Sequence, residues 1–267
     1  MNDKNEFDAV FPVLRHAGEM MLSARDPDSR VHEKYGSSNF VTDYDIAVQS
    51  YIIGETEKLF PGAVFLAEEK VNDAVFPDDE TVFVIDPIDG TTNFMRGVGV
   101  SCVSFAAVRG GETVFGAVYD PYRKEMFHAC PGGGAFLNGR PISVARHDPE
   151  KALTVFGTSP YYKDTLCDAT FELAKRLFLA GADVRRTGSA ALDLACVASG
   201  RYDLFFEMIL QPWDIAAGIL LIREAGGVIT TLSGTPVSPL RQSSILAGSE
   251  KVYEAAKALA APFADGK

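Results

Sequence analysis

The 267-residue sequence contains only four cysteines, one tryptophan and four histidines. The cysteines are widely spaced and form no Cys-x-x-Cys pair, which argues against a disulfide framework or a zinc site. We therefore expect reduced, mostly buried thiols at Cys102, Cys130, Cys167 and Cys196. The longest apolar stretches, such as 215–222, are too short to span a bilayer. The polar segment 1–6 precedes no long apolar run, so we expect no signal peptide, no membrane partner and a cytoplasmic location.

Positive charge is also scarce. The chain has 25 Lys and Arg residues against 36 Asp and Glu residues, a formal net charge of −11, which opposes binding to nucleic acid. Such a charge suits a protein that concentrates divalent cations, although an acidic surface also simply keeps a protein soluble. We expect no nucleic-acid partner, and net charge alone does not decide between the other two explanations.

The chain has no low-complexity segment, no detectable repeat and no Walker-type phosphate loop. The glycine-rich segment 132–134 is better explained as a flexible turn. Hydrophobic residues make up 47% of the sequence, enough for a substantial core in one large domain or two intimate subdomains. We place a boundary after residue 148, between an N-terminal subdomain over 1–148 with the candidate metal motifs and a C-terminal subdomain over 149–267.

The two parts differ in the secondary structure that their sequences predict. Residues 7–22 carry apolar side chains at helical spacing, with Pro12 in a first turn or at a kink, and Thr42 and Asp45 resemble a capping box before a helix to about Phe60. Between 64 and 137, short β-rich runs separated by Gly, Pro and Asn-Gly signals predict a largely antiparallel sheet.

Beyond Pro149, strands and helices alternate, which is typical of an α/β arrangement. Pro212 and Gly226 bracket one helix, with proline first and glycine last. Sequence pattern alone therefore predicts a mixed α and β fold. The expected C-terminal elements are strands at 153–157 and 204–207 and helices near 164–179, at 189–198 and at 213–225.

The most informative segment is 86–94, with the sequence DPIDGTTNF. The β-branched and aromatic run 81–85 predicts a buried strand leading directly into Asp86. Pro87 fixes φ and Gly90 permits backbone angles closed to other residues, so Asp86 and Asp89 can converge on one point. Asp-Pro and Asp-Gly are also ordinary turn dipeptides. The whole string nevertheless favours a metal site beside a phosphate.

Hard oxygen donors dominate the candidate site. The candidate ligands are the carboxylates Glu68, Asp86, Asp89 and Asp214, and no histidine lies within a motif. Oxygen-only ligands favour Mg²⁺ over Zn²⁺. Two such ions, roughly 3.5–4 Å apart, could stabilise both the attacking and the leaving oxygen of a displacement at phosphorus.

Segment 86–94, with Ala67-Glu68-Glu69 before it and Trp213 to Gly218 after it, closely resembles the inositol monophosphatase family of metal-dependent sugar phosphatases. The resemblance covers most of the chain. It implies a layered αβαβα sandwich of the inositol monophosphatase and fructose-1,6-bisphosphatase type, with the active site between its halves. It also implies two or three Mg²⁺ ions, lithium sensitivity and a homodimer. Two departures are Ala67 in place of a common Gly and Asn39 in place of a frequent Asp.

The resemblance also implies roles for residues of this sequence. Metal ligands would be Glu68, Asp86, the carbonyl of Ile88, Asp89 and Asp214. Glu68 and Thr91 would orient the attacking water, and Asp45 would help hold a further, weaker metal and polarise the Thr91 hydroxyl. Asp45 also fits a helix cap, and the two roles are compatible.

Phosphate and substrate contacts follow from the same resemblance. Phosphate would rest on N–H groups around Gly90, Thr91 and Thr92. Ser189 also fits an ordinary helix N-cap, whereas a carboxylate after the apolar run 204–206 is poorly explained by packing. Residues expected to contact substrate hydroxyls are Asp89, Gly188, Ser189, Ala190, Glu207 and Asp214.

The leading functional hypothesis is a Mg²⁺-dependent phosphomonoesterase acting on a small phosphorylated polyol or sugar, with myo-inositol monophosphate as the preferred substrate. The motif specifies phosphate and metal binding but not the leaving group. Alternative substrates therefore remain: fructose 1,6-bisphosphate, histidinol phosphate, a nucleotide 3′-phosphate and NADP. Two other classes also remain open: a phosphotransferase using the same metals, and a regulatory protein that uses the fold to bind a partner such as the transcription machinery.

Overall fold

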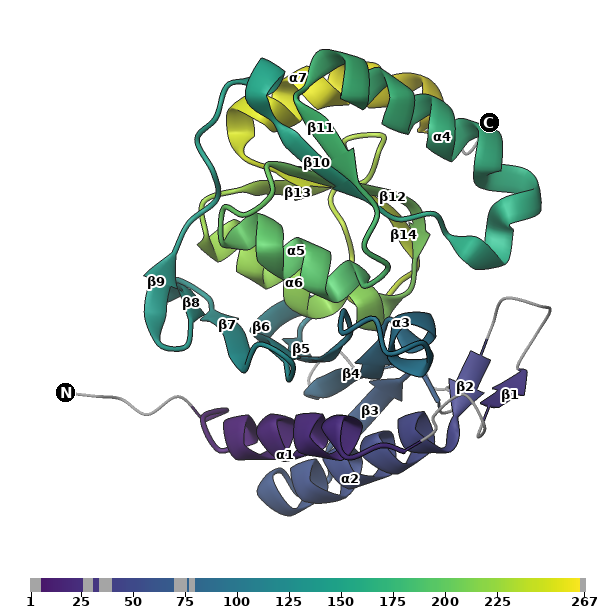
Figure 1. Ribbon diagram of the computed structural model, residues 1–267. Coiled ribbons are helices and arrows are strands. Elements are labelled where there is room, and N and C mark those ends of the chain that lie inside the picture. Colours follow the sequence, from purple (N-terminus) through teal and green to yellow (C-terminus); the bar gives the residue numbers. More distant parts are fainter. Residues whose placement is uncertain (1–5, 26–30, 34–39, 70–75, 77–79, 265–267) are drawn as a thin grey trace.

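The helices and strands form five stacked layers (Figure 1). The computed structural model describes residues 6–25, 31–33, 40–69, 76 and 80–264; Asn39 therefore lies outside the described residues. Two helices, α1 (Val10–Leu22) and α2 (Asp43–Leu59), cover the outer face of the N-terminal sheet. Helices α5 (Ala190–Ala198) and α6 (Pro212–Glu224) lie between the two sheets. The expected αβαβα sandwich is confirmed.

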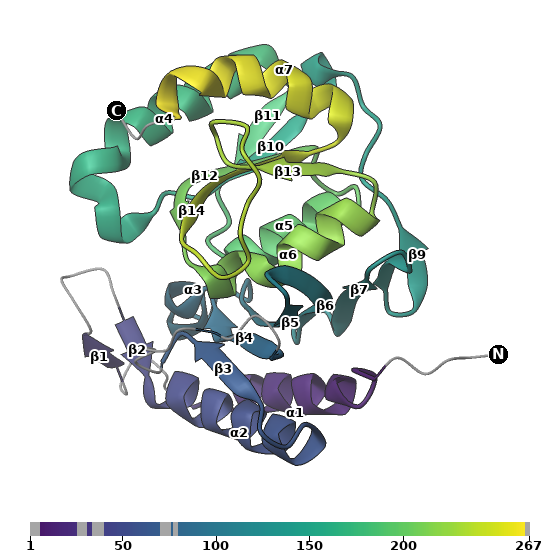
Figure 2. The same cartoon turned by 180° about the vertical axis from the view of Figure 1, so that it is seen from behind.

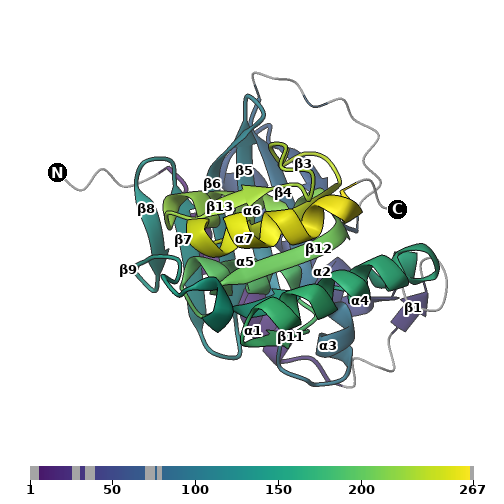
Figure 3. The same ribbon diagram turned by 90° about the horizontal axis from the view of Figure 1, so that it is seen from above.

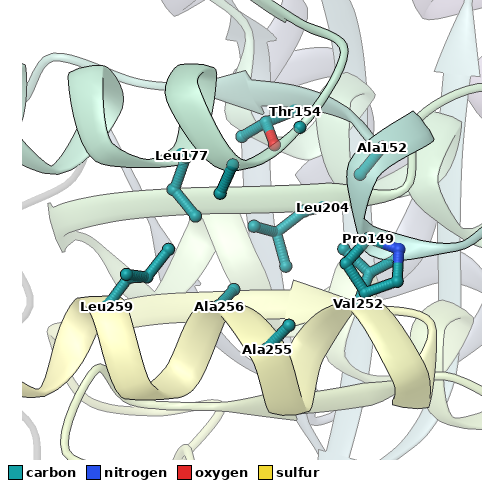
Figure 4. Close-up of a pocket in the computed structure, with 11 residues that line it drawn as sticks. Pro149, Ala152, Thr154, Leu177, Leu204, Val252, Ala255, Ala256 and Leu259 are labelled. Atoms are coloured by element: carbon teal, nitrogen blue, oxygen red, sulfur yellow. The ribbon is translucent and has the colours of Figure 1, made fainter.

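The outermost layer covers the C-terminal sheet. Helices α4 (Lys163–Ala180) and α7 (Glu250–Ala260) pack on each other and on this sheet, as the view from above shows (Figure 3). Between α4 and α7 lies a cavity of about 20 Å³, lined mainly by alkyl side chains such as Leu177, Leu204 and Val252 (Figure 4). None of its lining residues is a carboxylate, so it is packing space rather than a site for metal or phosphate.

The N-terminal sheet has seven strands in the order β3-β4-β5-β6-β7-β8-β9. Only the β3–β4 pair is parallel, so the expectation of a largely antiparallel sheet is confirmed. Asn138 and Gly139, with φ of 50° and 76°, form the expected turn between β8 and β9. The strands are β3 (Val64–Ala67), β4 (Val82–Asp89), β5 (Cys102–Arg109), β6 (Glu112–Asp120), β7 (Glu125–Cys130), β8 (Gly134–Leu137) and β9 (Arg140–Ile142).

The C-terminal sheet has five strands in the order β11-β10-β12-β14-β13. The pairs of β10 are parallel and those of β14 are antiparallel, which fits the strand and helix alternation read from the sequence. The strands are β10 (Leu153–Phe156), β11 (Asp183–Arg185), β12 (Leu204–Leu210), β13 (Val228–Thr230) and β14 (Ser243–Gly248). The remaining elements are β1 (Val31–Glu33), β2 (Phe40–Thr42), α3 (Thr91–Met95), η2 (Pro149–Lys151), η3 (Pro160–Tyr162) and η4 (Ala261–Phe263).

The central helix layer explains the apolar run at 215–222. Residues 215–222 of α6 are buried because both sheets cover this layer. Close approach needs small residues: a Cβ at Gly116 of β6 would lie 2.9 Å from the carbonyl oxygen of Ala217. No helix in the described part of the chain is long and apolar enough to cross a membrane.

Helix ends follow their sequence signals. Thr42 caps α2, and the Asp45 carboxylate completes the capping box by accepting from the Thr42 N–H. Gly226, with φ of 80°, ends α6 as expected. All four cysteines are free, as predicted, but the expectation of mostly buried thiols is wrong. Only Cys102 is buried, and Cys167 lies on the exposed face of α4.

The glycine-rich turn at 132–134 has a structural partner. The Glu224 carboxylate at the end of α6 accepts hydrogen bonds from the N–H groups of Gly132 and Gly134, both at 2.8 Å. These N–H groups are therefore occupied within the fold. The turn joins β7 to β8 and is not a phosphate loop.

Candidate active site

Strand β4 ends in an acidic turn at the edge of the central layer. All of β4 is buried, and its pairing with β5 shifts register between Asp86 and Asp89, which brings two carboxylates out of one short bulge. The Ile88 N–H donates to Asp86 Oδ1 at 3.0 Å and stiffens the turn. Gly90 has φ of 89°, and a Cβ there would lie 3.0 Å from the Val100 carbonyl oxygen. Only glycine therefore fits comfortably at this position.

Asp214 joins this turn from another element. It lies in the first turn of α6, where its Oδ2 accepts from the Gln211 N–H at 2.7 Å. One carboxylate oxygen each from Asp86, Asp89 and Asp214 lie within 4.8 Å of one another. Three oxygen donors at this spacing fit a hard divalent cation such as Mg²⁺.

The electrostatics of the cluster favour a cation. Burial raises the pKa of Asp86 well above its usual value, and the charges of Glu68 and Asp89 raise it further. Burial, followed by the charges of Asp89 and Glu68, also raises the pKa of Asp214 well above its usual value. Buried carboxylates that repel one another are costly unless a counter-charge joins them. A divalent ion bound between them would supply that charge.

Asp89 is held from the other side of the molecule. Its Oδ2 accepts from the Ser189 hydroxyl at 2.6 Å, from the Ala191 N–H at 2.8 Å and, more weakly, from the Cys102 thiol at 3.7 Å. Burial raises the pKa of Asp89, and the hydrogen bonds from Ser189 and Ala191 oppose that rise. Ser189 stands at the N-cap position of α5, yet its side chain makes no capping bond. Its hydroxyl instead ties α5 to the acidic turn.

Thr91 and Asp45 form a second connected pair. Asp45 is fully buried; its Oδ2 accepts from the Thr42 N–H at 2.8 Å and its Oδ1 lies 3.3 Å from Thr91 Oγ1. Asp45 thus completes the expected helix cap and also contacts the Thr91 hydroxyl, whereas its expected role beside a further metal stays a prediction. The Thr91 hydroxyl also lies 3.1 Å from the Ile88 carbonyl oxygen. The Thr91 hydroxyl has one hydrogen, which it can donate to either of these two acceptors. Its oxygen lone pairs stay available to accept a hydrogen bond.

Glu68 follows directly after β3 and extends the ladder to β4. Its N–H donates to the Ile85 carbonyl oxygen at 3.2 Å, and its side chain is half-buried. Its charge is the first to raise the pKa of Asp86 after burial, which puts the carboxylate beside the cluster. The next residue, Glu69, is tied to α2 because its N–H donates to Gln49 Oε1 at 2.9 Å.

Asn93 links the acidic turn to the segment before α5. Its side-chain amide donates to the carbonyl oxygens of Val100 at 2.7 Å and Thr187 at 2.9 Å. This bridge fixes the position of Gly188, which has φ of 98°. Asn93 belongs to the DPIDGTTNF string, but nothing in the sequence shows that its partner is 94 residues away.

Glu207 faces the site from β12. It is buried, and its Oε1 accepts from the Ser159 N–H at 2.7 Å and lies 3.3 Å from the Ser159 hydroxyl. Burial raises its pKa to about 7, against the bonds from Ser159 and the charge of Arg186. A Cβ at Gly157 would overlap the Glu207 carboxylate, so glycine is needed for this side chain to lie where it does. Gly157 and Ser159 have no recognisable functional signal in the sequence.

The site therefore draws on both sheets and the helix layer between them. The turn after β4 supplies Asp86, Asp89 and Thr91, with Gly90 and Thr92 beside them, and α6 supplies Asp214. Ser189 and Ala190 begin α5, and Glu207 lies on β12. The fold and the site thus define a layered αβαβα protein with a candidate divalent-metal site at the junction of its layers.

Comparison with known proteins gives the family. Residues 3–264 match the model of the inositol monophosphatase family. The chain is 40% identical over 246 residues to "Nus factor SuhB" of Escherichia coli K12, covering 91% of each chain. It is 39% identical over 221 residues to "Inositol-1-monophosphatase" of Mesorhizobium japonicum, covering 82% of each. The crystal structure of extragenic suppressor protein suhB from Bartonella henselae superposes with a TM-score of 0.86 at 33% identity, covering 95% of this chain and 97% of the other.

The chain belongs to the inositol monophosphatase family. The resemblance inferred from its sequence motifs is confirmed, and so is the fold that this resemblance implied.

Proposed function

We propose that the protein is a Mg²⁺-dependent phosphomonoesterase that hydrolyses a small polyol or sugar phosphate, with myo-inositol monophosphate as the preferred substrate. The observation that carries this proposal is the convergence of Asp86, Asp89 and Asp214 within 4.8 Å at a largely buried site. Family membership supports it, as does the name of the Mesorhizobium relative. The substrates named as alternatives share the same chemistry and remain to be compared directly.

In this mechanism, the ligands are Glu68, Asp86, the Ile88 carbonyl, Asp89 and Asp214. Bound Mg²⁺ supplies positive charge for the attacking and leaving oxygens of the phosphate ester. A third ion, if it binds, would lie beside Asp45.

The remaining residues position water and substrate. Glu68 and Thr91 orient the attacking water, and Asp45 orients the Thr91 hydroxyl through their contact at 3.3 Å. N–H groups at Gly90, Thr91 and Thr92 receive the phosphate oxygens. Attack by water forms a new P–O bond, breaks the ester P–O bond and yields inorganic phosphate and the alcohol. The attacking water releases the proton that balances the one taken up by the leaving alkoxide.

The substrate alcohol faces the C-terminal sheet. Glu207 accepts from its hydroxyl groups, and backbone groups at Gly188 and Ala190 contact it, together with Asp89 and Asp214. The Ser189 hydroxyl already donates to Asp89 at 2.6 Å, so Ser189 can only accept from the substrate through its remaining lone pair.

Phosphate release from a substrate panel tests the proposal. The panel contains myo-inositol 1-phosphate, fructose 1,6-bisphosphate, histidinol phosphate, a nucleotide 3′-phosphate and NADP, each with Mg²⁺ and with EDTA. We expect metal-dependent release, fastest from the inositol phosphate. Release unaffected by EDTA would contradict the metal mechanism. A clear preference for another ester would make that ester the substrate in place of myo-inositol monophosphate. Product analysis with added acceptor alcohols separates hydrolysis from phosphoryl transfer.

A partner-binding role is the second candidate, because a relative at 40% identity carries the name "Nus factor SuhB". The retained carboxylate cluster argues that catalysis is not lost, but both roles can share one fold. Stoichiometric recovery of a partner by the purified protein, with no hydrolysis of any panel substrate, would favour this role alone. Equal recovery by Asp86→Asn would show that the partner does not need the metal site.

Two further properties remain predictions from the family resemblance. We expect a homodimer, which light scattering with size-exclusion chromatography can measure. We expect inhibition by millimolar Li⁺, because Li⁺ can replace one Mg²⁺ after product leaves. A cytoplasmic location and the boundary after residue 148 also remain predictions; limited proteolysis would test the boundary.

A further inference from the structure

Tyr161 is a large aromatic side chain beside the acidic cluster that the functional argument has not used. It lies on η3, in the segment between β10 and α4, and its side chain is 53% exposed. This segment reaches out on the side of the molecule where α3 lies, as opposite views show (Figures 1 and 2). The Tyr161 ring is therefore partly open to solvent.

The turn that carries Tyr161 is anchored to Glu207 and its strand. Ser159 adopts a left-handed backbone conformation with φ of 41°, rare for a residue with a side chain. Its N–H donates to Glu207 at 2.7 Å, and its hydroxyl contacts both the carbonyl oxygen of Ile209, at 3.0 Å, and the N–H of Ile209, at 3.1 Å. Its carbonyl oxygen accepts from the Tyr162 N–H at 2.8 Å. The backbone on both sides of Tyr161 is thus fixed relative to Glu207.

A second anchor comes from the segment before α5. The Arg186 guanidinium donates to the Thr158 hydroxyl at 3.0 Å. The turn is therefore tied to β12 and to the strand end that leads into Gly188. Two of the elements that carry candidate substrate contacts also hold the Tyr161 turn in place, which is the arrangement that precise recognition needs.

The charges of the acidic cluster act on the phenol of Tyr161. Partial burial raises the pKa of Tyr161, and the charges of Glu68 and Asp214, then Asp86 and Asp89, raise it further. A tyrosine hydroxyl is protonated near neutral pH in any case and can donate a hydrogen bond. Within the part of the chain that the structure describes, this hydroxyl makes no hydrogen bond to another residue.

We propose that Tyr161 is a specificity-determining residue that contacts the non-phosphate part of the substrate, with its hydroxyl bonding a substrate hydroxyl and its ring covering a C–H face. The inference rests on the proposed phosphomonoesterase function. A polyol fits better than a nucleobase, because the turn that carries Tyr161 is bonded through Ser159 to the Glu207 carboxylate, which accepts bonds from hydroxyl donors. The polyol would lie between Glu207 and Tyr161, with its phosphate on the metal side.

Tyr161→Phe and Tyr161→Ala test the proposal, with Tyr162→Phe and Tyr162→Ala as matched controls on the same turn. Steady-state kinetics with Mg²⁺ compares myo-inositol 1-phosphate with ethyl phosphate, which has no free hydroxyl, and with a nucleotide 3′-phosphate. We expect Tyr161→Phe to raise KM for the inositol phosphate by about three- to tenfold, the size of one hydrogen bond, and to change kcat less. Tyr161→Ala should raise it further. KM for ethyl phosphate should not change.

Two readouts separate recognition from a structural role. The inhibition constant of inorganic phosphate and the Tm should match wild type in the Tyr161 variants, since phosphate alone lies on the metal side. Equal loss on every substrate together with a lower Tm would overturn the proposal in favour of packing. If Tyr161→Phe leaves the kinetics unchanged and Tyr161→Ala lowers activity only on the nucleotide, Tyr161 contacts a nucleobase and not a polyol.

The outcomes also separate this inference from the function on which it rests. If wild type hydrolyses the inositol phosphate with Mg²⁺ and both Tyr161 variants match it, the inference fails and the proposed function stands. If wild type hydrolyses no ester with Mg²⁺, the proposed function fails and takes the inference with it.

Discussion

The two sheets contribute to the site in different ways. On the N-terminal side, Asp86 and Asp89 lie three residues apart on one bulge, and a buried strand delivers both. On the C-terminal side, the candidate substrate contacts come from separate places: the turn at 157–161, the start of α5 and Glu207 on β12. One short turn thus supplies two of the candidate metal ligands, whereas Asp214 and the candidate substrate contacts are brought to the site over long sequence distances.

The difference extends to what each group demands of its surroundings. The metal-site carboxylates have pKa values raised by burial and mutual repulsion, and a cation relieves that cost. Glu207 is instead satisfied within the protein, by Ser159 and near Arg186. We therefore expect changes at the metal-site carboxylates to remove catalysis, and changes around Glu207 to alter substrate choice.

The largest expected effect is that of Asp86→Asn or Asp214→Asn. Each change removes one charged ligand while keeping the side-chain shape, so we expect kcat to fall roughly a hundredfold or more. Glu112→Gln, an exposed carboxylate paired with Arg223 on the surface, is the control and should keep full activity. Near-normal turnover by both Asn variants would mean that the hydrolytic site lies elsewhere.

Gly157→Ala should act on the substrate side alone. The added Cβ would displace the Glu207 carboxylate, so we expect KM for the inositol phosphate to rise about tenfold, the loss of one charge-assisted hydrogen bond. Gly54→Ala on α2 is the matched control, because nothing lies within 4 Å of its Cβ. It should raise stability by roughly 0.5–1 kcal/mol and leave KM unchanged. Identical kinetics for the two alanine variants would remove Glu207 from substrate binding.

Glu207→Gln sharpens the comparison through pH. The pKa of Glu207 is about 7, so the carboxyl is mostly protonated at pH 6 and mostly ionised at pH 8. An ionised carboxylate accepts the stronger hydrogen bond from a substrate hydroxyl. The ratio of KM in the variant to KM in wild type should therefore rise severalfold from pH 6 to pH 8, and taking the ratio cancels the ionisation of the substrate phosphate. A flat ratio would contradict this role.

Thermal unfolding should show how much the repulsion among the metal-site carboxylates destabilises the metal-free protein. Carboxyls whose folded-state pKa is raised bind protons more tightly in the folded than in the unfolded protein, so without metal these groups destabilise increasingly as pH rises above about 4. Mg²⁺ should raise Tm by a few degrees at pH 8 and less at pH 5.5, where protons compete. Asp86→Asn should lose most of the Mg²⁺ shift. A shift independent of pH would place Mg²⁺ binding outside the cluster.

More of the metal site than of the substrate side could be predicted from the sequence. The strand before Asp86, the turn residues Pro87 and Gly90, and the helix that carries Asp214 are all predicted from the sequence, because each depends on local backbone preferences. The role of Ser189 was predicted only as cap or substrate contact, and its bond to Asp89 crosses 100 residues. Cys102, Asn93, Gly157 and Tyr161 were missed as site neighbours, since only tertiary packing brings them to the cluster.

Direct detection of the metal tests the central claim most sharply, that both sides of the molecule hold one divalent-metal site between them. Crystals soaked in Mn²⁺, measured for anomalous scattering, should show density between Asp86, Asp89 and Asp214, and the density should be absent in Asp214→Asn. Density only at other surface carboxylates, or density unaffected by that substitution, would contradict the account.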